Sequence, residues 1–128
     1  MKFTLKTIIE ASAKDIYNAW LDSTGHTKMT GGEATIDDGI GSNFTAWDGY
    51  IKGENLELDI DKRIVQSWRT SDFHEKDEDS KIEITLDEEA GKTVLTLVHT
   101  NLPENGEQYR QGWGDHYFEP MREYFNGK

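Results

Sequence analysis

Alternation of apolar and polar side chains dominates the first hundred residues. In residues 2–11, Phe3, Leu5 and Ile9 fall on one side, and lysine, threonine and glutamate side chains fall on the other. This period of two predicts a half-buried strand. The same alternation in KIEITLD (81–87) leaves one face polar. It predicts an antiparallel sheet with one solvated side.

Turn residues divide the middle of the chain into short apolar segments. We expect strands at 33–36, 42–47, 50–58, 63–71, 80–87 and 92–100. The Asp-Gly pairs at 38–39 and 48–49 favour tight hairpin turns, because their residues tolerate positive φ. The acidic segment FHEKDED (73–79) predicts a charged hairpin loop.

Helical spacing follows the first strand and returns at the end of the chain. In SAKDIYNAWLD (12–22), Ser12 is the predicted N-cap with Asp15 three residues later. The next ten residues, STGHTKMTGG, are rich in turn formers, and we expect no more than one irregular helical turn there. After Leu102-Pro103 an aromatic and apolar stripe recurs at intervals of three and four: Tyr109, Trp113, Tyr117, Met121 and Tyr124.

This last segment defines the expected architecture. Pro120 removes a backbone donor, so we expect a kink or a restart of the helix there. The last helix is the only predicted element long enough to cover the apolar side of the sheet. We therefore expect an α+β fold in which a curved antiparallel sheet of about six to seven strands wraps around a long C-terminal helix. We expect residues 1–128 to form one domain.

Charge and composition narrow the partners. The formal net charge is −11. An acidic surface repels nucleic acid and anionic lipid, so we expect neither nucleic acid nor membrane as a partner. The chain has no cysteine, which fits a reducing compartment, and no apolar run approaches the ~20 residues that span a bilayer. We expect a cytoplasmic protein.

Known chemical motifs are absent from the sequence. The four histidines are far apart and lack metal-ligand spacing, and no phosphate loop, nucleophile elbow or dinucleotide fingerprint occurs. We therefore expect no metal and no cofactor.

The segment RQGWGDHYFEPMREYF (110–125) is the densest candidate for chemistry. His116 is next to Asp115 and three residues before Glu119. Adjacent helical residues diverge by about 100° and cannot pair well, and an i,i+3 pair is common on a wet helix face. We interpret these rings as the wall of a core, and we assign no catalytic residue to them.

The order of elements resembles the helix-grip fold shared by START domains and the birch-pollen allergen. The run RQGWGDHYFE (110–119) resembles the pattern Arg-Gln-Gly-Trp-x-x-Tyr-Tyr-Phe-Glu of one family within it, the homologues of the activator of the 90-kDa heat-shock protein ATPase. Further matches support the resemblance: TLKTIIEASAKDIYNAW at the start, Gly53-Glu54, Ile64-Val65, Trp68-Arg69 and Leu102-Pro103. The family pattern has tyrosine where this chain has His116.

The resemblance implies one half of a larger protein. The eukaryotic namesake of the family is a two-domain co-chaperone whose other domain makes the principal contact with the chaperone. This chain resembles only the helix-grip half. The resemblance implies a heat-shock chaperone as one candidate partner.

Three functions stay open. The first is a non-enzymatic domain that binds a small hydrophobic ligand in a cavity between the sheet and the C-terminal helix. The second is a module that binds a 90-kDa heat-shock chaperone and modulates its ATPase. The third is a cavity-based enzyme that uses His99, which the alternation of its strand turns inward. Trp47, beside a turn, is a candidate to guard an opening or to contact a partner. The candidate cavity residues are Phe44, Gln66, Trp68, His99, Trp113 and Tyr117.

Overall fold

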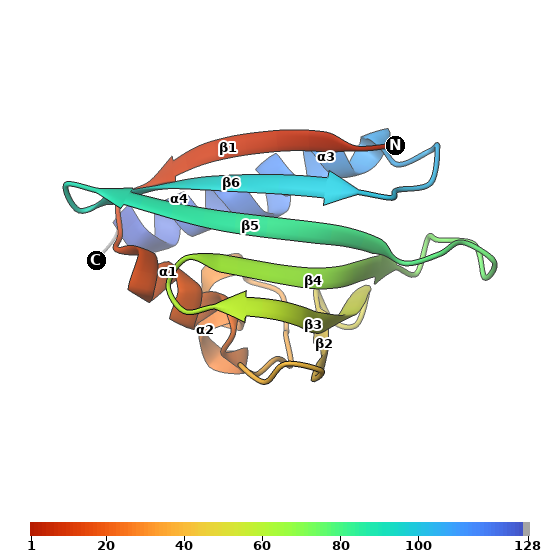
Figure 1. Cartoon of the computed structure of the whole chain (residues 1–128), viewed down its shortest axis with the longest axis horizontal. Helices are drawn as coiled ribbons and strands as arrows, with labels where there is room; N and C mark the ends of the chain where they lie inside the picture. Colours follow the sequence, from red (N-terminus) through yellow and green to blue (C-terminus); the bar gives the residue numbers. More distant parts are fainter. Residues whose placement is uncertain (127–128) are drawn as a thin grey trace.

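The computed structural model describes residues 1–126 and has one antiparallel sheet packed against a long helix (Figure 1). The strands run in the order β1-β6-β5-β4-β3-β2, and every neighbouring pair is antiparallel. The predicted α+β class and the sheet around a C-terminal helix are confirmed. The strands are β1 (Phe3–Ile9), β2 (Asn43–Ala46), β3 (Ile51–Asp59), β4 (Arg63–Thr70), β5 (Ser80–Glu89) and β6 (Lys92–Thr100).

The C-terminal helix consists of three consecutive segments, α3 (Glu107–Trp113), η1 (Gly114–Phe118) and α4 (Glu119–Asn126). Figure 1 shows it passing behind the strands, which it covers on one face. Tyr124 of the predicted stripe is half-buried. The buried face carries Tyr109, Trp113, Tyr117, Phe118, Met121 and Phe125. Between residues 1 and 126, no helix is long and apolar enough to cross a membrane.

The irregularity expected at Pro120 takes the form of the π-helical segment η1. The amide of Glu119 donates to the carbonyl of Gly114, five residues back. Proline lacks an amide hydrogen and its ring crowds the carbonyl four residues earlier. A wider turn directly before Pro120 accommodates this ring without ending the helix.

Helix α1 (Ala13–Trp20) begins as predicted. The Oγ of Ser12 accepts a hydrogen bond of 3.1 Å from the amide of Asp15, which satisfies one of the free donors of the first turn. The helix buries Ile16, Tyr17 and Trp20 against the core. Because its apolar residues share one face, the first helix packs on the same core as the C-terminal helix.

The prediction of at most one irregular helical turn after α1 is wrong. Residues Ser23–Thr30 form the two-turn helix α2. Asp22 caps its start by accepting from the amide of Gly25 at 2.8 Å, and Gly31 ends it with φ 89°. Local propensity is low here, but two caps and the burial of His26 and Met29 outweigh it.

The strand expected at 33–36 is also wrong, because only an isolated bridge joins Thr35 to Thr45. Side chains of α2 take the backbone groups that a strand ladder would use. The Oγ of Ser23 bonds both the amide and the carbonyl of Ile36, at 2.9 and 3.1 Å. Residues 38–39 consequently lie in a long loop, whereas the Asp-Gly pair at 48–49 does lie in the turn between β2 and β3.

Candidate functional site

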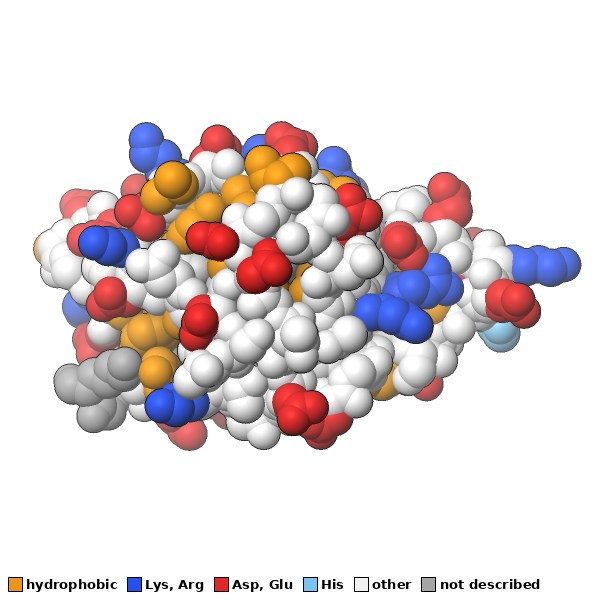
Figure 2. Space-filling model, turned by 90° about the horizontal axis from the view of Figure 1, so that it is seen from below, with side chains coloured by type: hydrophobic (Ala, Val, Ile, Leu, Met, Phe, Trp, Pro, Cys, Tyr) orange, Lys and Arg blue, Asp and Glu red, His pale blue; other side chains and the backbone are white. Residues whose placement is uncertain are grey.

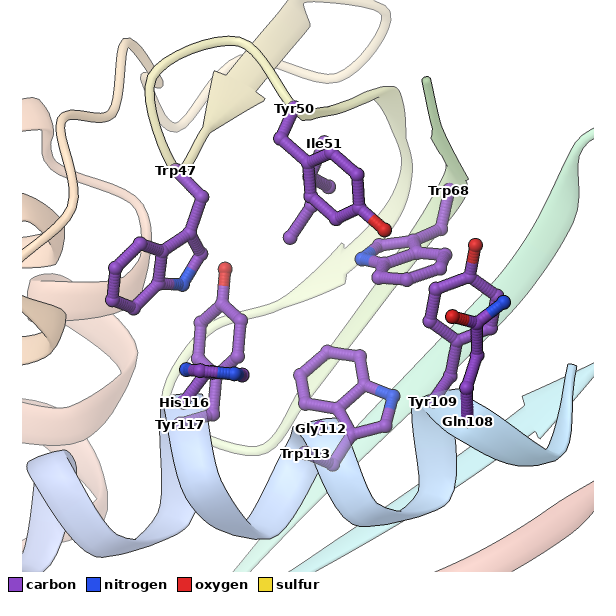
Figure 3. A pocket seen from close by; sticks show the side chains of 10 residues that line it. All are labelled: Trp47, Tyr50, Ile51, Trp68, Gln108, Tyr109, Gly112, Trp113, His116 and Tyr117. Carbon is purple, nitrogen blue, oxygen red and sulfur yellow. The ribbon is translucent and has the colours of Figure 1, made fainter. Parts of the chain in front are cut away.

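A pocket of about 430 Å³ lies between the C-terminal helix, β4 and the turn that joins β2 to β3 (Figure 3). Pockets that bind small organic molecules have volumes of about 300–1,000 Å³. Its walls are mostly aromatic. The lining residues are Trp47, Tyr50, Ile51, Trp68, Gln108, Tyr109, Gly112, Trp113, His116 and Tyr117.

The pocket has a buried floor and an exposed rim. The floor consists of Ile51, Trp68, Tyr109, Trp113 and Tyr117, all of which are buried. The rim carries the exposed side chains of Tyr50, Gln108 and His116 and the half-buried Trp47. The lining contains no aspartate, glutamate, lysine or arginine. An apolar floor with a few polar groups at the entrance suits a neutral organic ligand.

Two neighbouring rows of the C-terminal helix supply most of the lining. Tyr109, Trp113 and Tyr117 are spaced at i and i+4, and Gln108, Gly112 and His116 follow the same spacing one residue earlier. A Cβ at Gly112 would meet no atom closer than the Cδ2 of His116, 4.0 Å away. The missing side chain therefore leaves open space in the pocket.

The floor rings pack on one another. The centroids of Trp113 and Tyr117 are 4.7 Å apart, and those of Trp68 and Trp113 are 5.8 Å apart. Tyr109 meets Trp68 edge to face, with centroids 5.1 Å apart and an interplanar angle of 83°. Such ring pairs add stabilisation beyond burial alone, so the floor is a preformed surface.

The two floor tyrosines are anchored through their hydroxyl groups. The hydroxyl of Tyr109 and Oγ1 of Thr70 form a hydrogen bond of 2.6 Å. The hydroxyl of Tyr117 lies 3.1 Å from Nε2 of His26, whose Nδ1 lies 2.8 Å from the carbonyl of Trp20. A carbonyl only accepts, so Nδ1 of His26 carries the hydrogen and the hydroxyl of Tyr117 donates to Nε2. The sequence interpretation did not find this role of His26, because it missed helix α2.

Burial keeps this histidine–tyrosine pair neutral. Desolvation lowers the pKa of His26, and the hydrogen bond to Trp20 opposes this shift only in part. Desolvation also raises the pKa of Tyr117. Both groups are therefore uncharged at neutral pH and hold the ring of Tyr117 in place.

His99 lies behind the pocket and outside its lining. Its Nδ1 accepts from the indole Nε1 of Trp113 at 3.0 Å. Its Nε2 therefore carries the hydrogen and donates to Oγ of Ser80 at 2.9 Å. Burial lowers the pKa of His99 to about 3. The neutral ring orients Trp113, and neither nitrogen is available to a molecule in the pocket.

Gln66 and Phe44 are buried but do not line the pocket either. Gln66 accepts from the indole nitrogen of Trp20 at 3.1 Å and donates to Oδ1 of Asn55 at 2.8 Å. Of the six residues named from sequence, Trp68, Trp113 and Tyr117 share the pocket wall. Phe44, Gln66 and His99 lie in the surrounding core.

The cavity residues named from sequence did not include Tyr50, Ile51, Gln108, Tyr109, Gly112 and His116. His116 is exposed, as expected for a wet helix face, but its ring meets the edge of Trp47 with centroids 5.5 Å apart. The acids near it have other partners: Asp115 accepts from Gln111, and Glu119 pairs with Arg122. The repeat at 108, 112 and 116 beside the aromatic row was the available signal.

Known proteins are similar to this chain in sequence and in fold. A curated human relative, activator of 90 kDa heat shock protein ATPase homolog 1, is 30% identical over 125 residues, which cover 97% of this chain and 37% of that protein. The chain thus spans little more than a third of that relative. The crystal structure of an HSP90 activator from Plasmodium falciparum superposes with a TM-score of 0.84 at 26% identity, covering 99% of this chain and 96% of that one.

A more distant structure shares the fold alone. The Aha1 dimer from Colwellia psychrerythraea superposes with a TM-score of 0.81 at 16% identity, covering 98% of this chain and 96% of that one. The family model described as activator of Hsp90 ATPase homolog 1-like protein matches residues 10–126, so this chain belongs to that family.

Proposed function

We propose that this domain binds a small apolar molecule in the aromatic pocket and does not transform it. The observation that carries the proposal is a space of about 430 Å³ walled by the rings of two layers of structure, the C-terminal helix and the β2–β4 part of the sheet. Removing apolar ligand surface from water provides about 25 cal/mol per Å². A flat ligand that covers the floor rings would gain this term and would meet no charged side chain.

We assign no reaction to this pocket. The candidate acid or base, His99, uses both ring nitrogens in hydrogen bonds to Trp113 and Ser80. A general base must reach the proton that it removes, either directly or through one water. In the neutral His26–Tyr117 pair, both ring nitrogens of His26 are likewise used in hydrogen bonds, one to the hydroxyl of Tyr117 and one to the carbonyl of Trp20.

Native mass spectrometry of the purified protein tests ligand binding. We expect a retained small molecule on the wild-type domain and its loss from Gly112→Leu, whose side chain would occupy the open space next to His116. Gly114→Leu is the matched control, because Gly114 lies two residues further along the helix, outside the pocket lining, with nothing within 4 Å of its Cβ position. Equal retention by both variants would refute binding in this pocket.

We propose contact with a 90-kDa heat-shock chaperone as a second function. The similarity to the human activator supports it. So does the net charge of −11, which would attract a basic surface. In Figure 2 acidic side chains are spread over the face that is seen instead of forming one patch.

The single-domain organisation of residues 1–128 and the cytoplasmic location remain predictions.

The chaperone from the same organism provides the test. We expect this domain to change its rate of ATP turnover, with an effect that weakens as salt is raised from 50 to 300 mM, because surface charges are screened beyond about 10 Å at 0.1 M salt. No binding and no change in turnover at high domain concentration would end this second proposal. The Gly112→Leu variant should retain the effect if the chaperone does not enter the pocket.

A further inference from the structure

Trp47 has the only buried side-chain nitrogen or oxygen without a hydrogen-bond partner among residues 1–126, and this residue lines the pocket. A buried donor that lacks a partner costs about 1–3 kcal/mol. The indole nitrogens of Trp20 and Trp113 do have protein acceptors, namely Gln66 and His99. Nε1 of Trp47 is thus a buried donor without a partner, unlike the indole nitrogens of Trp20 and Trp113.

The unused donor faces the pocket. Figure 3 shows the indole nitrogen of Trp47 turned toward the space between the β2–β3 turn and the C-terminal helix. The indole nitrogen of Trp68 faces the same space from the opposite wall. This nitrogen is covered in the structure, so a ligand oxygen reaches its N–H group after a small shift of the rim side chains, among them His116, whose ring contacts Trp47.

The backbone and its neighbours hold Trp47 in this position. Its φ is 49°, in the left-handed region that bulky residues rarely adopt, and Asp48 and Gly49 follow with φ 60° and 89°. Strained conformations of this kind persist where the surroundings fix them and often lie at functional sites. Gly32 packs against the indole so closely that a Cβ there would lie 2.4 Å from Cε3 of Trp47. On another side, His116 meets the same ring.

The lining also limits the charge of a ligand. It has no lysine or arginine to neutralise a carboxylate and no acid to neutralise an amine. An ion that leaves water without a partner pays a desolvation cost of several kcal/mol. A neutral oxygen acceptor needs only one donor, and Trp47 offers it.

From these observations, and resting on the proposed binding function, we infer that the pocket takes a neutral, flat aromatic molecule that carries a carbonyl-type oxygen, and that Nε1–H of Trp47 donates to this oxygen. Aromatic rings of the ligand cover the floor formed by Trp68, Trp113 and Tyr117. The oxygen points to the rim. Trp47 is thereby the residue that separates a ketone or quinone from a hydrocarbon of the same shape.

A matched pair of ligands isolates this hydrogen bond. 1-Tetralone and tetralin have the same bicyclic shape, and only the first has a carbonyl oxygen. Each is titrated into ¹⁵N-labelled protein while the indole N–H signals are followed by NMR, with the signal of Trp47 identified by its loss in Trp47→Phe. We expect 1-tetralone to move the Trp47 signal downfield and tetralin to leave it near its starting position. The substitution should weaken 1-tetralone about tenfold more than tetralin, which corresponds to about 1.4 kcal/mol.

Gly32→Val provides a second variant, because it keeps Trp47 but displaces its ring. It should lose the preference for 1-tetralone in the same way, provided that the dispersed amide spectrum of the fold persists. Equal binding of both ligands, or a shift confined to Trp68, would overturn the role of Trp47 and leave the pocket function intact. Binding of neither ligand would overturn both.

Discussion

Trp113 donates its indole N–H to Nδ1 of His99 over 3.0 Å, a bond that ties the C-terminal helix to β6. Nε2 of His99 donates to Oγ of Ser80, and this hydroxyl in turn donates to the backbone carbonyl of Trp68. The indole ring of Trp113 is thus linked through the neutral His99 and Ser80 to the backbone of Trp68 in β4. The pocket wall and the protein core are parts of the same hydrogen-bonded structure, so their stabilities are coupled.

Stability should fall in acid because His99 and His26 are buried as neutral rings. The unfolded chain binds a proton at each histidine near pH 6.5, whereas the folded protein holds the pKa of His99 at about 3. The free energy of unfolding should be flat above pH 7 and should decrease below pH 6.5 by up to about 1.4 kcal/mol per pH unit for each histidine. Urea denaturation between pH 8 and pH 4.5 measures this slope.

Replacing His99 measures how much this residue contributes to the pH dependence of the free energy of unfolding. His99→Gln should lower the stability at pH 8, because Trp113 loses its acceptor, and should reduce the dependence on pH between 6.5 and 4.5. His74→Gln, in the exposed loop between β4 and β5, is the control and should retain the wild-type slope. A His99→Gln profile parallel to the wild type would contradict the account of the buried neutral ring.

Gln66 should be more important for stability than an exposed glutamine. Gln66→Leu leaves Nε1 of Trp20 and Oδ1 of Asn55 without their partner. Two unsatisfied buried groups should lower the free energy of unfolding by about 2–6 kcal/mol. Gln111→Leu, on an exposed position of the C-terminal helix, should change it by less than about 0.5 kcal/mol. Chemical denaturation of the two variants compares them, and equal effects would contradict the buried network.

The packing of the C-terminal helix on the sheet can be tested at Met121. This side chain is fully buried. Met121→Ala should lower the free energy of unfolding by about 2–5 kcal/mol, because it removes apolar burial and leaves a cavity. Glu123→Ala, on the exposed side of the same helix, is the control. A thermal melt in which both variants match the wild type would mean that this face of the helix does not pack on the core.

The sheet and the last helix could be predicted because their patterns are long. Alternation in 81–87 and 92–100 and the stripe from Tyr109 to Met121 each repeat often enough to fix a face. Helix α2 could not, since its residues have low helix propensity and its stability comes from Asp22, Gly31 and the burial of His26. The strand prediction at 33–36 failed because helix α2 was missed: Ser23 of α2 hydrogen-bonds the backbone of this segment.

Only part of the pocket could be predicted from the sequence. Its floor follows from the aromatic stripe, since Trp113 and Tyr117 must face the sheet. Its rim depends on the β2–β3 turn, which places Trp47 and Tyr50 beside the C-terminal helix. No sequence pattern predicts that this turn lies close to the helix. The inward direction of His99 was readable from alternation, but its bond to Trp113 was not, because it depends on how the helix crosses β6.

Calorimetric titration of 1-tetralone into the wild-type domain, Gly112→Leu and Gly114→Leu measures directly whether the aromatic pocket binds a ligand. We expect one saturable site on the wild type, an affinity within about twofold of the wild-type value for Gly114→Leu, and at least about tenfold weaker binding to Gly112→Leu. Equal affinities for all three proteins, or no saturable binding to the wild type, would contradict the claim that this pocket holds the ligand.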